Sequence, residues 1–499
     1  MDKVSATAYR QSESLPLNGR SVGKEDTRKR KRSLFVGKFR LFNHFVHGQF
    51  VLLATFEFVT LACLMLGLSD WKLEGLGDYA RMLFPPTLLS FFLAAVGLYD
   101  TRQRPHSSYV IKRILSALVL STLCLVSVNI VWVWFRGYPL FELGVTEAAS
   151  SALVLFSIRG LFYRYVDGKV LRKRVMVYGA GKRAAYIQLM RRKADMRGFE
   201  LVGFVSESGV SVDDAIQNSG KDILHDSSEL AAWAKAHQVD EIVVALDDRR
   251  QGKRINELLQ CKLSGIEVID MLDFFERERG VIHLDLFNPG WMIYSRGFKP
   301  DTWRSFKKRA IDVLASLFLL FIFSPFIVLT IIAILIECRG KDKIFYTQKR
   351  VGRDGKPFDV YKFRSMRSDA EAGGKAQWAQ KNDARVTKVG EIIRKFRIDE
   401  LPQLWNVLIG DMSLVGPRPE RPQFVDHLEG LNSLYPERHR VSPGVTGWAQ
   451  LCYPYGASDE DSLKKLEFDL YYVKNHSFFL DMYILIQTVE VVLFQKGSR

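Results

Sequence analysis

The chain has 499 residues, a net charge of +16 and an isoelectric point of about 9.5, and its length is enough for roughly three domains. Its basic residues gather in the N-terminal tail, beside apolar runs and around short motifs, so the charge favours membrane surfaces and phosphorylated substrates over nucleic acid. Five widely separated cysteines without a CxxC pair indicate neither a disulfide framework nor a zinc site.

The N-terminal segment, residues 1–45, is polar and carries the basic run TRKRKR. It lacks the apolar stretch that a secretory signal peptide needs. Because basic residues before a membrane helix stay on the cytoplasmic side, we expect a basic, disordered cytoplasmic tail.

Residues 46–165 are predicted to form a bundle of four transmembrane α-helices. Three apolar runs are near the roughly 20 residues that a membrane helix needs, and a fourth is interrupted by Glu142 and Glu147. The four runs are residues 50–68, 83–99, 114–135 and 141–161. Basic residues precede the first run, fill the second loop and follow the fourth, so both ends of the bundle should face the cytoplasm. The alternative is a set of buried helices in a large soluble protein.

A fifth apolar run, residues 313–336, differs from the first four because both of its ends are basic. Ser324 and Pro325 lie in its middle, and a proline inside a helix removes a hydrogen bond and kinks it. We expect a Pro-broken re-entrant membrane helix over residues 310–337 that enters and leaves on one face. A simple span is the alternative, and it would leave one basic end outside.

Residues 170–290 have the pattern of a Rossmann-like α/β domain with a parallel sheet. Gly179 and Gly181 follow a β-rich run and form a candidate nucleotide-binding turn, and Glu207 could meet a ribose hydroxyl. A membrane nucleotide-sugar dehydratase would hold NAD here, but its Tyr-x-x-x-Lys motif is not found well after the turn. We favour a degenerate, regulatory or assembly domain.

The last part of the chain, residues 300–499, is dense in polar and basic motifs after its apolar run. The stretch RIDELPQLWN places Asp399 beside Glu400, and apolar spacing predicts a helix that begins near Glu400. One interpretation is that a carboxylate caps this helix, with Pro402 in its first turn. The other is a magnesium and phosphate site in which one carboxylate is a nucleophile, because Arg394 and Arg397 are close by.

Two further motifs of this domain carry cations. Residues 345–366 have the turn signals of a β-hairpin and include Lys362 and Arg364. The stretch GPRPERP cannot continue a helix, so it should be a rigid turn that presents Arg418 and Glu420.

The stretches KFRSM, IDELPQLWNVLIGDMSLVGPRPE, SPGVTGWAQ and FDLYYVKN closely resemble, in the same order, motifs of the bacterial sugar transferase family. These are the monotopic phosphoglycosyl transferases that begin exopolysaccharide synthesis, and the resemblance implies an α+β catalytic domain over residues 300–499. The preceding apolar runs and the Rossmann-like domain resemble the long form of the family, the polyprenyl glycosylphosphotransferases. The Ser324–Pro325 break is also similar to the family's re-entrant helix.

The resemblance implies transfer of a sugar-1-phosphate from a UDP-sugar, expected to be UDP-glucose or UDP-galactose, to polyprenyl (undecaprenyl) phosphate with release of UMP. It implies Asp399 as the nucleophile that forms a phosphoryl-aspartate and Glu400 as the ligand of Mg²⁺. It implies phosphate binding by Lys362, Arg364 and Arg394, and a nucleotide-sugar pocket at Pro417, Arg418, Pro419 and Glu420. It also implies a multi-pass protein of the bacterial inner membrane, with the Rossmann-like and catalytic domains in the cytoplasm.

Other expectations are smaller. His439 is expected to be a local or phosphate-adjacent residue, and Trp448 a core residue. The acidic run Asp459–Asp461 should begin a helix. A homodimer through the membrane or Rossmann-like parts is a further expectation. A non-catalytic scaffold for polysaccharide assembly is the third functional alternative, and the sequence does not fix the sugar.

Overall fold

The computed structural model describes residues 37–493 apart from several internal segments. Those outside the description are 42–43, 69–74, 100–106, 139, 141–144, 166–171, 191–197, 207–210, 226–229, 248–254, 288, 296, 299–301, 340–342, 368–384 and 454–457. The expectations for the first 36 residues and for Glu207 therefore lie outside the described residues.

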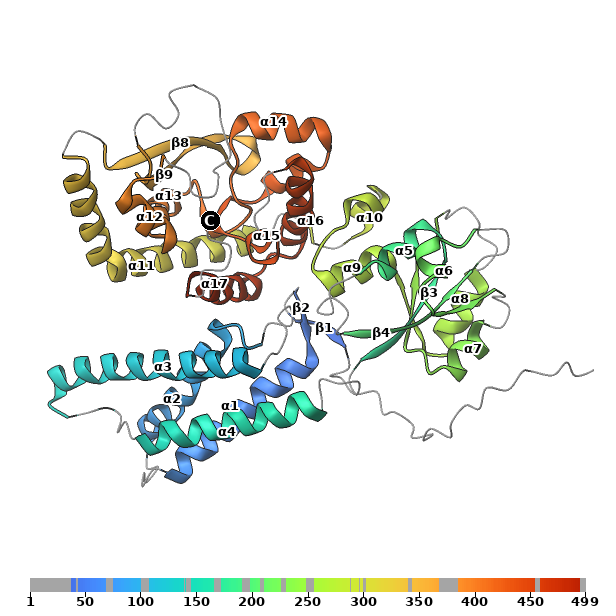
Figure 1. The fold of residues 1–499 in the computed structure, drawn as a ribbon, viewed down its shortest axis with the longest axis horizontal. Helices are drawn as coiled ribbons and strands as arrows, with labels where there is room; N and C mark the ends of the chain where they lie inside the picture. The colour runs from blue at the N-terminus through green and yellow to red at the C-terminus, as the bar shows by residue number, and fades with distance from the viewer. Residues whose placement is uncertain are drawn as a thin grey trace, which may run out of the picture. The chain divides into compact units, whose positions relative to one another are not determined.

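The first described part is a short antiparallel strand pair followed by four helices (Figure 1). The elements are β1 (Lys38–Leu41), β2 (His44–His47), α1 (Gly48–Leu68), α2 (Leu76–Ala95), α3 (Ser107–Arg136) and α4 (Val145–Tyr165). Helix α1 packs on α2 and α4, and α3 packs on the same two helices. In the described residues, each of the four predicted runs therefore corresponds to one helix of this bundle.

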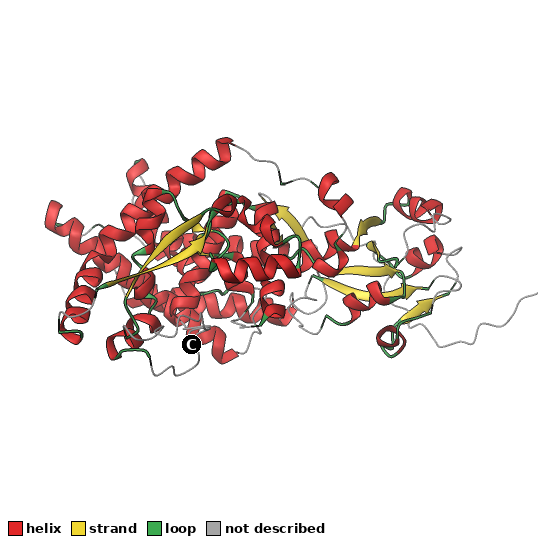
Figure 2. Ribbon diagram, turned by 90° about the horizontal axis from the view of Figure 1, so that it is seen from above, coloured by secondary structure: helices red, strands yellow, loops and turns green. Residues whose placement is uncertain are grey.

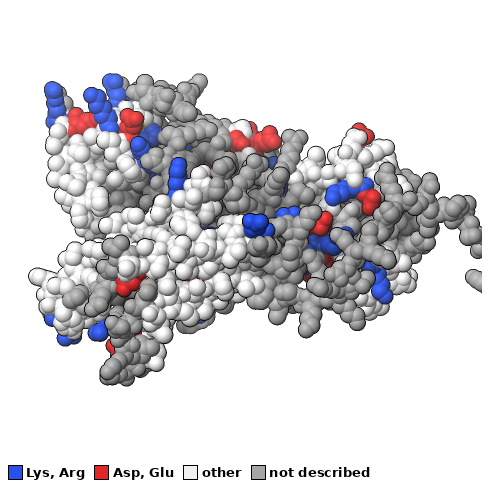
Figure 3. Space-filling model, turned by 60° about the horizontal axis from the view of Figure 1, so that its bottom comes forward, with Lys and Arg blue, Asp and Glu red and all other residues white. Residues whose placement is uncertain are grey.

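Not all four helices qualify as membrane spans by length and hydropathy. In the described part of the chain, three helices are long and apolar enough to cross a membrane: α1, α3 and α11 (Thr302–Glu337). Many apolar side chains of α1, α3 and α4 are exposed, among them Phe56, Trp134 and Leu153. Figure 3 shows wide areas of one face without Lys, Arg, Asp or Glu. Such a surface fits contact with lipid, since soluble proteins rarely expose large apolar areas.

A buried ion pair joins the first and fourth helices of the bundle. Arg159 Nε lies 2.7 Å from Glu57 Oε1, and both side chains are at most 1% exposed. The Tyr99 hydroxyl donates to Glu57 Oε2 at 2.5 Å, and Arg159 also donates to the Leu98 carbonyl at 3.2 Å. Charges among apolar helices are costly unless they are paired and hydrogen-bonded, so this pair ties α1, α4 and the segment after α2 together.

The α/β domain is a five-stranded parallel sheet in the order β5-β4-β3-β6-β7, and Figure 2 shows helices on both sides of it. Its elements are β3 (Lys173–Tyr178), α5 (Lys182–Gln188), β4 (Phe199–Val205), α6 (Asp214–Gln217), β5 (Asp222–Leu224), α7 (Leu230–Ala236), β6 (Glu241–Val244), α8 (Ile255–Leu263), β7 (Glu267–Asp270) and α9 (Met271–Arg279). The central strand β3 is fully buried over its last four residues, as a parallel strand covered on both faces must be. The predicted parallel α/β fold is confirmed.

The C-terminal domain follows η3 (Leu284–Leu286) and α10 (Pro289–Tyr294). After α11 it contains β8 (Phe345–Val351), η4 (Arg353–Gly355), β9 (Pro357–Phe363), α12 (Lys388–Lys395), η5 (Ile398–Glu400), α13 (Gln403–Ile409), β10 (Ser413–Val415), α14 (Pro422–Leu431), η6 (Tyr435–Arg440), β11 (Gly444–Thr446), α15 (Trp448–Cys452), α16 (Asp459–Asn475) and α17 (Phe478–Leu493). The predicted hairpin is present as the antiparallel pair β8–β9. The predicted acidic helix start is also present, because Ser458 caps α16 and Asp461 closes the capping box.

Helix α11 begins earlier than the predicted re-entrant helix and continues through the proline. It starts at Thr302 instead of residue 310, and Pro325 lies inside it without ending it. Figure 1 shows α11 as two limbs that meet at a bend. The Ser324 hydroxyl donates to the Phe321 carbonyl at 2.7 Å, which satisfies a carbonyl near the proline. The structure therefore keeps one bent helix where the sequence suggested a break.

Both limbs of α11 contact the same domain. Near its start, Arg309 donates to the carbonyls of Val407 and of Leu408, the latter at 2.6 Å, at the end of α13. At its end, Glu337 accepts a hydrogen bond from the Val389 backbone N–H of α12 at 3.1 Å. A straight helix of this length would separate its ends by roughly 54 Å, so the bend is what lets both ends reach neighbouring helices.

Replacing Arg159 with Gln would leave the buried carboxyl group of Glu57 without its cation, so we expect stability to fall by about 3–5 kcal/mol. Thermal unfolding of the full chain in detergent measures this. Lys112→Gln removes an exposed cation from α3 and is the matched control, expected within about 0.5 kcal/mol of the wild type. Equal stability of the two variants would contradict the role of the buried pair.

Candidate active site

Asp399 and Glu400 lie in a short turn between two helices and do not cap either one. They end the 3₁₀ turn η5, which follows Arg397 in a left-handed conformation with φ of 60°. Helix α13 begins only at Gln403, with Pro402 at the N-cap position and no side-chain cap. The predicted helix start near Glu400 and the capping interpretation are both wrong, because the chain turns sharply before α13. The two carboxylates are therefore left for another role.

Glu400 is the point where three separate segments meet. Lys362 Nζ, from strand β9, lies 3.2 Å from Glu400 Oε1, and Arg418 Nη2, from the turn after β10, lies 3.0 Å from the same oxygen. The Glu400 side chain is only 12% exposed. A carboxylate bound by two cations at low exposure is held in one position and ionised.

The two neighbouring carboxyl groups have opposite electrostatic surroundings. Burial and the charge of Glu400 raise the pKa of Asp399 to about 6, against the attraction of Lys362. Burial also acts to raise the pKa of Glu400, but the attraction of Lys362, Arg418 and Arg397 outweighs it and holds that pKa well below its usual range. A pair of carboxyl groups whose pKa values are driven apart is typical of catalytic sites.

Arg394 and Arg364 are the other two predicted phosphate-binding residues. The positive charge of Arg394 acts on Asp399 and lowers its pKa, so this residue belongs to the site. For Arg364, the described contact is that of its backbone N–H with the Ile344 carbonyl, at 2.9 Å. The structure therefore joins Lys362 to Glu400 by an ion pair and places Arg394 close enough for its charge to act on Asp399.

The predicted PRPE turn has two functions. Arg418 binds Glu400, as described above, whereas Glu420 accepts from Arg350 Nη1 at 3.2 Å. The Pro419 carbonyl accepts from the same Arg350 nitrogen at 3.2 Å, and the Pro417 carbonyl accepts from the Gly444 N–H at 2.9 Å. One face of the turn therefore completes the site, and the other fastens the turn to the domain.

Sequence reasoning missed the groups that hold this turn in place. Arg438 donates to the Arg418 carbonyl at 2.8 Å and to Asp469 Oδ2 at 2.8 and 3.0 Å, and Arg438 and Asp469 are both buried. Arg350 makes the contacts with Pro419 and Glu420. In the sequence, Arg350 is one of several cations in a basic stretch, and nothing there indicates that it binds the PRPE turn. The pairing of Arg438 with Asp469 joins positions 31 apart, so no local spacing could reveal it.

The residues fit the Mg²⁺ ion that the resemblance implies. Among the described residues, the buried Asp399 Oδ1 has no hydrogen-bond partner. The carboxylate pair therefore keeps one oxygen that can accept a ligand. The described part of the chain has no group of three or more His, Cys, Asp and Glu side chains that could hold a metal. Mg²⁺ needs only one or two carboxylates when substrate phosphates supply other ligands.

The glycine turn of the α/β domain is filled by a side chain of the protein itself. Gly179 has a φ of 131°, and Gly181 precedes helix α5. The Asp247 carboxylate accepts from the backbone N–H groups of Lys182 and Arg183 at 3.0 and 2.8 Å. A pyrophosphate at this helix start would have to displace an anion of the same charge, which agrees with a domain that does not use the turn for catalysis.

The fold and the site define a membrane protein whose C-terminal domain holds a buried carboxylate pair among cations. Residues 303–495 match the family described as bacterial sugar transferase, and residues 94–265 match the family described as CoA-binding domain. The chain belongs to the bacterial sugar transferase family.

Three curated relatives give the range of similarity. The chain is 40% identical to UDP-N-acetylgalactosamine-undecaprenyl-phosphate N-acetylgalactosaminephosphotransferase of Aeromonas hydrophila over 53% of this chain and 61% of the relative. It is 30% identical to undecaprenyl-phosphate glucose phosphotransferase of Komagataeibacter xylinus over 66% and 60%. It is 34% identical to UDP-glucose:undecaprenyl-phosphate glucose-1-phosphate transferase of Klebsiella pneumoniae over 71% and 75%. The chain thus spans about three fifths of the first two relatives.

His439 gives a pH prediction. Burial and the charge of Arg438 lower the pKa of His439 to about 4, so it is a weak base near pH 7. Because an unfolded histidine titrates near pH 6.5, the unfolded chain binds a proton between about pH 6.5 and 4 that the folded chain does not, and stability falls as the pH falls through this range.

We therefore expect His439→Gln to flatten the decline of the melting temperature between about pH 6.5 and 4.5, with less effect at pH 8. His225→Gln, at an exposed histidine, should keep the wild-type slope. Thermal unfolding at a series of pH values makes the measurement. A wild-type slope in the His439 variant would mean that this histidine is not neutral in the fold.

Proposed function

We propose that this protein transfers a sugar-1-phosphate from a UDP-sugar to undecaprenyl phosphate, releases UMP and thereby starts the synthesis of an exopolysaccharide, capsule or O-antigen. The observation that carries the proposal is the buried Asp399–Glu400 pair, in which Glu400 is bound by Lys362 and Arg418 while Asp399 Oδ1 is left without a hydrogen-bond partner in the described residues. The family and the named activities of the relatives support the same reaction.

In the first proposed step, a carboxylate oxygen of Asp399 forms a bond to the β-phosphorus of the UDP-sugar. The bond from that phosphorus to the bridging oxygen breaks, and its electron pair leaves with UMP. Lys362, Arg394 and Arg418 are the cations near the two carboxylates, and they offset the charge of the pyrophosphate. The product is a sugar-phosphoryl ester of Asp399.

In the second proposed step, a phosphate oxygen of undecaprenyl phosphate forms a bond to the same phosphorus. The bond from phosphorus to Asp399 breaks, the carboxylate is restored, and undecaprenyl-diphosphate-sugar is released. Both steps displace one oxygen at phosphorus by another, so no general base is required by the balance of atoms. A neutral, weakly basic His439 is compatible with that scheme.

Glu400 is assigned as the ligand of Mg²⁺ and Asp399 as the nucleophile, because their surroundings differ. Glu400 is fixed by two cations and stays ionised, whereas Asp399 is buried next to a like charge. Bound through Glu400 and donor phosphate oxygens, Mg²⁺ would neutralise charge on the leaving phosphate. Lys362 and Arg418 hold the carboxylate of Glu400 in one position.

We propose that α11 is a re-entrant membrane helix and that both large domains lie in the cytoplasm of a bacterial inner membrane. The bend at Pro325 and the contacts of both limbs with one domain support this. The arrangement would hold the carboxylate pair at the membrane surface, where a soluble nucleotide and a lipid phosphate can both arrive. A homodimer stays a prediction.

The dehydratase alternative has no support in the site. Asp247 occupies the amides at which a dinucleotide pyrophosphate would bind, and neither of the two matching families, bacterial sugar transferase and CoA-binding domain, is described as a dehydratase. Only a measurement of sugar-1-phosphate transfer distinguishes the non-catalytic scaffold from the proposed enzyme. The candidate sugars are glucose and galactose. N-acetylated sugars are also candidates, because the Aeromonas relative is named for one.

We expect Asp399→Asn to reduce UMP release by at least about a thousandfold in the full chain assayed with Mg²⁺, undecaprenyl phosphate and a panel of UDP-sugars. With radiolabelled donor and no acceptor, the wild type should retain protein-bound label and the variant should not. Asp426→Asn, at an exposed carboxylate of α14, is the matched control and should behave as the wild type. Turnover of Asp399→Asn near the wild-type rate would refute the nucleophile.

Glu400→Gln tests the metal ligand separately. We expect the Mg²⁺ concentration at half-maximal rate to rise about tenfold or more, because the amide is a poorer ligand than a carboxylate. An unchanged Mg²⁺ dependence with a lower maximal rate would assign Glu400 to positioning Lys362 and Arg418 instead.

The re-entrant topology predicts that both ends of α11 react from one side of the membrane. In a variant that keeps Cys338 as its only cysteine, and in a second with only Thr302→Cys, a membrane-impermeant maleimide should label inside-out vesicles and leave intact spheroplasts unlabelled. Labelling of the two positions from opposite sides would establish a simple span.

A further inference from the structure

Asn406 is a fully buried asparagine within α13, and it has no role in the steps of the proposed transfer. Its side-chain NH₂ group donates to the Asp359 carbonyl of β9 at 2.7 Å, and its Oδ1 accepts from the Tyr361 N–H at 3.0 Å. In an extended strand, the carbonyl of one residue and the N–H two residues later point to the same side. The amide of Asn406 therefore binds β9 in the way that a neighbouring strand would.

These two hydrogen bonds close a loop of contacts that includes the carboxylate pair. Tyr361 is followed directly by Lys362, whose ammonium group lies 3.2 Å from Glu400 Oε1. From Glu400 the chain passes through residues 401–405 and returns to Asn406. The position of Lys362 relative to Glu400 therefore depends on how α13 is held against β9.

Apolar contacts also hold α13 and β9 in the domain, but they do not set the register between them. Leu404 and Val407 of α13 and Val360 of β9 belong to one buried apolar cluster. Such contacts are non-directional, so a helix can shift along a strand with little loss of buried area. A hydrogen bond needs a narrow range of distance and angle, so two bonds from one amide allow one position. The register is accordingly set by Asn406.

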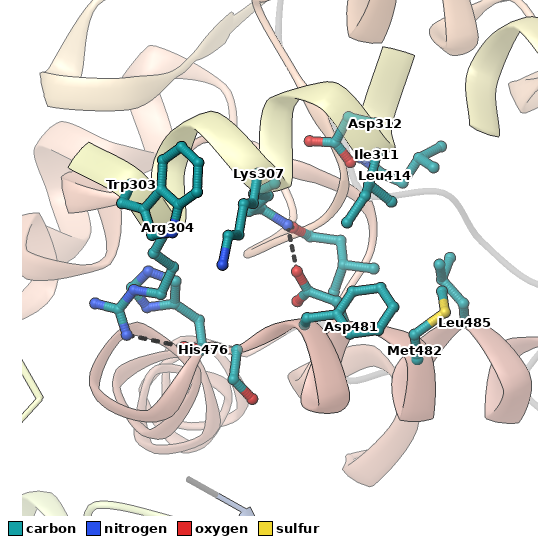
Figure 4. A pocket seen from close by; sticks show the side chains of 14 residues that line it. Trp303, Arg304, Lys307, Ile311, Asp312, Leu414, His476, Asp481, Met482 and Leu485 are labelled. Carbon is teal, nitrogen blue, oxygen red and sulfur yellow. Dashed lines mark hydrogen bonds and ion pairs between the residues drawn. The ribbon is translucent and has the colours of Figure 1, made fainter. Parts of the chain in front are cut away.

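The second cation of the site, Arg418, is held through a different helix. Asp312 of α11 is buried and accepts from the Leu414 N–H of β10 at 3.1 Å (Figure 4). Strand β10 leads directly into the turn that carries Arg418. This support does not pass through β9, so a change at Asn406 should displace Lys362 and leave Arg418 in place.

We propose that Asn406 is a positioning residue for sugar-1-phosphate transfer, which holds Lys362 where it binds Glu400 and reaches the phosphates of the donor. The proposal rests on the function proposed above. Asn406 is fully buried, so it acts through Lys362 and does not touch the substrate. Without the amide, apolar contacts have to hold β9 against α13, and a misplacement of about 1 Å can lower a rate about a hundredfold.

The rate at which a radiolabelled UDP-sugar labels the full chain without acceptor tests the proposal, with the sugar that the panel above selects. We expect Asn406→Ala to be labelled about a hundredfold more slowly than the wild type and to reach the same amount of label per mole. A loss of folded protein would lower that final amount instead. Leu480→Ala truncates a buried leucine of α17, and as the matched control it should lower the melting temperature and keep the wild-type rate.

A double-mutant cycle with Lys362 separates positioning from a general structural role. Where Lys362→Gln has already removed the cation, Asn406→Ala should slow labelling by less than about threefold, because the effects of residues that act as a unit are not additive. The same large loss in both backgrounds would show a general structural role and overturn the proposal. A wild-type rate of labelling in Asn406→Ala would overturn it as well.

Asn406→Asp provides the measurement if the alanine variant does not fold. This variant keeps the shape of the side chain and the oxygen that accepts from Tyr361, but an ionised carboxylate repels the Asp359 carbonyl. We therefore expect labelling at least about tenfold slower than in the wild type, and an unchanged rate would count against the proposal. Failure of the wild type itself to take up label would contradict the proposed function, so the two failures are distinguishable.

Discussion

The binding of one carboxylate by two cations is the constraint on which the active site depends. Glu400 lies in a turn, Lys362 on a strand and Arg418 in a proline-rich turn, and the Glu400 side chain brings the three together. Because the three segments are far apart in the chain, each must be fixed by its own contacts. Arg438 and Asp469 fix the Arg418 turn, and the β8–β9 hairpin fixes Lys362. Asp399 then receives its unusual surroundings from the position of its neighbour.

The membrane helix and the site depend on the same domain. Arg309 at one end of α11 and Glu337 at the other bind the helices that flank the carboxylate turn. The bend within α11 therefore brings both of its limbs to the domain that holds the carboxylate pair. The helix and the carboxylate pair are therefore parts of one packed domain.

The α/β domain shows why a motif needs its surroundings. Gly179 and Gly181 have the spacing of a nucleotide-binding turn, and the parallel sheet around them is present. Asp247 occupies the backbone N–H groups that would otherwise bind phosphate. The approach of the Asp247 side chain to Gly181 is so close that a Cβ there would meet it, and the glycine is explained by that contact without a ligand.

The sequence by itself determined the apolar helices, the parallel sheet, the β8–β9 hairpin and the neighbouring positions of Asp399 and Glu400, because these features follow from local periodicity and turn chemistry. It misplaced the start of α13 because the left-handed Arg397 and the turn after it depend on distant packing. Only the tertiary structure decided which cations bind Glu400, which side chain fills the glycine turn and that both limbs of α11 meet one domain. Those contacts join residues far apart in the chain, and a linear pattern carries no distance between them.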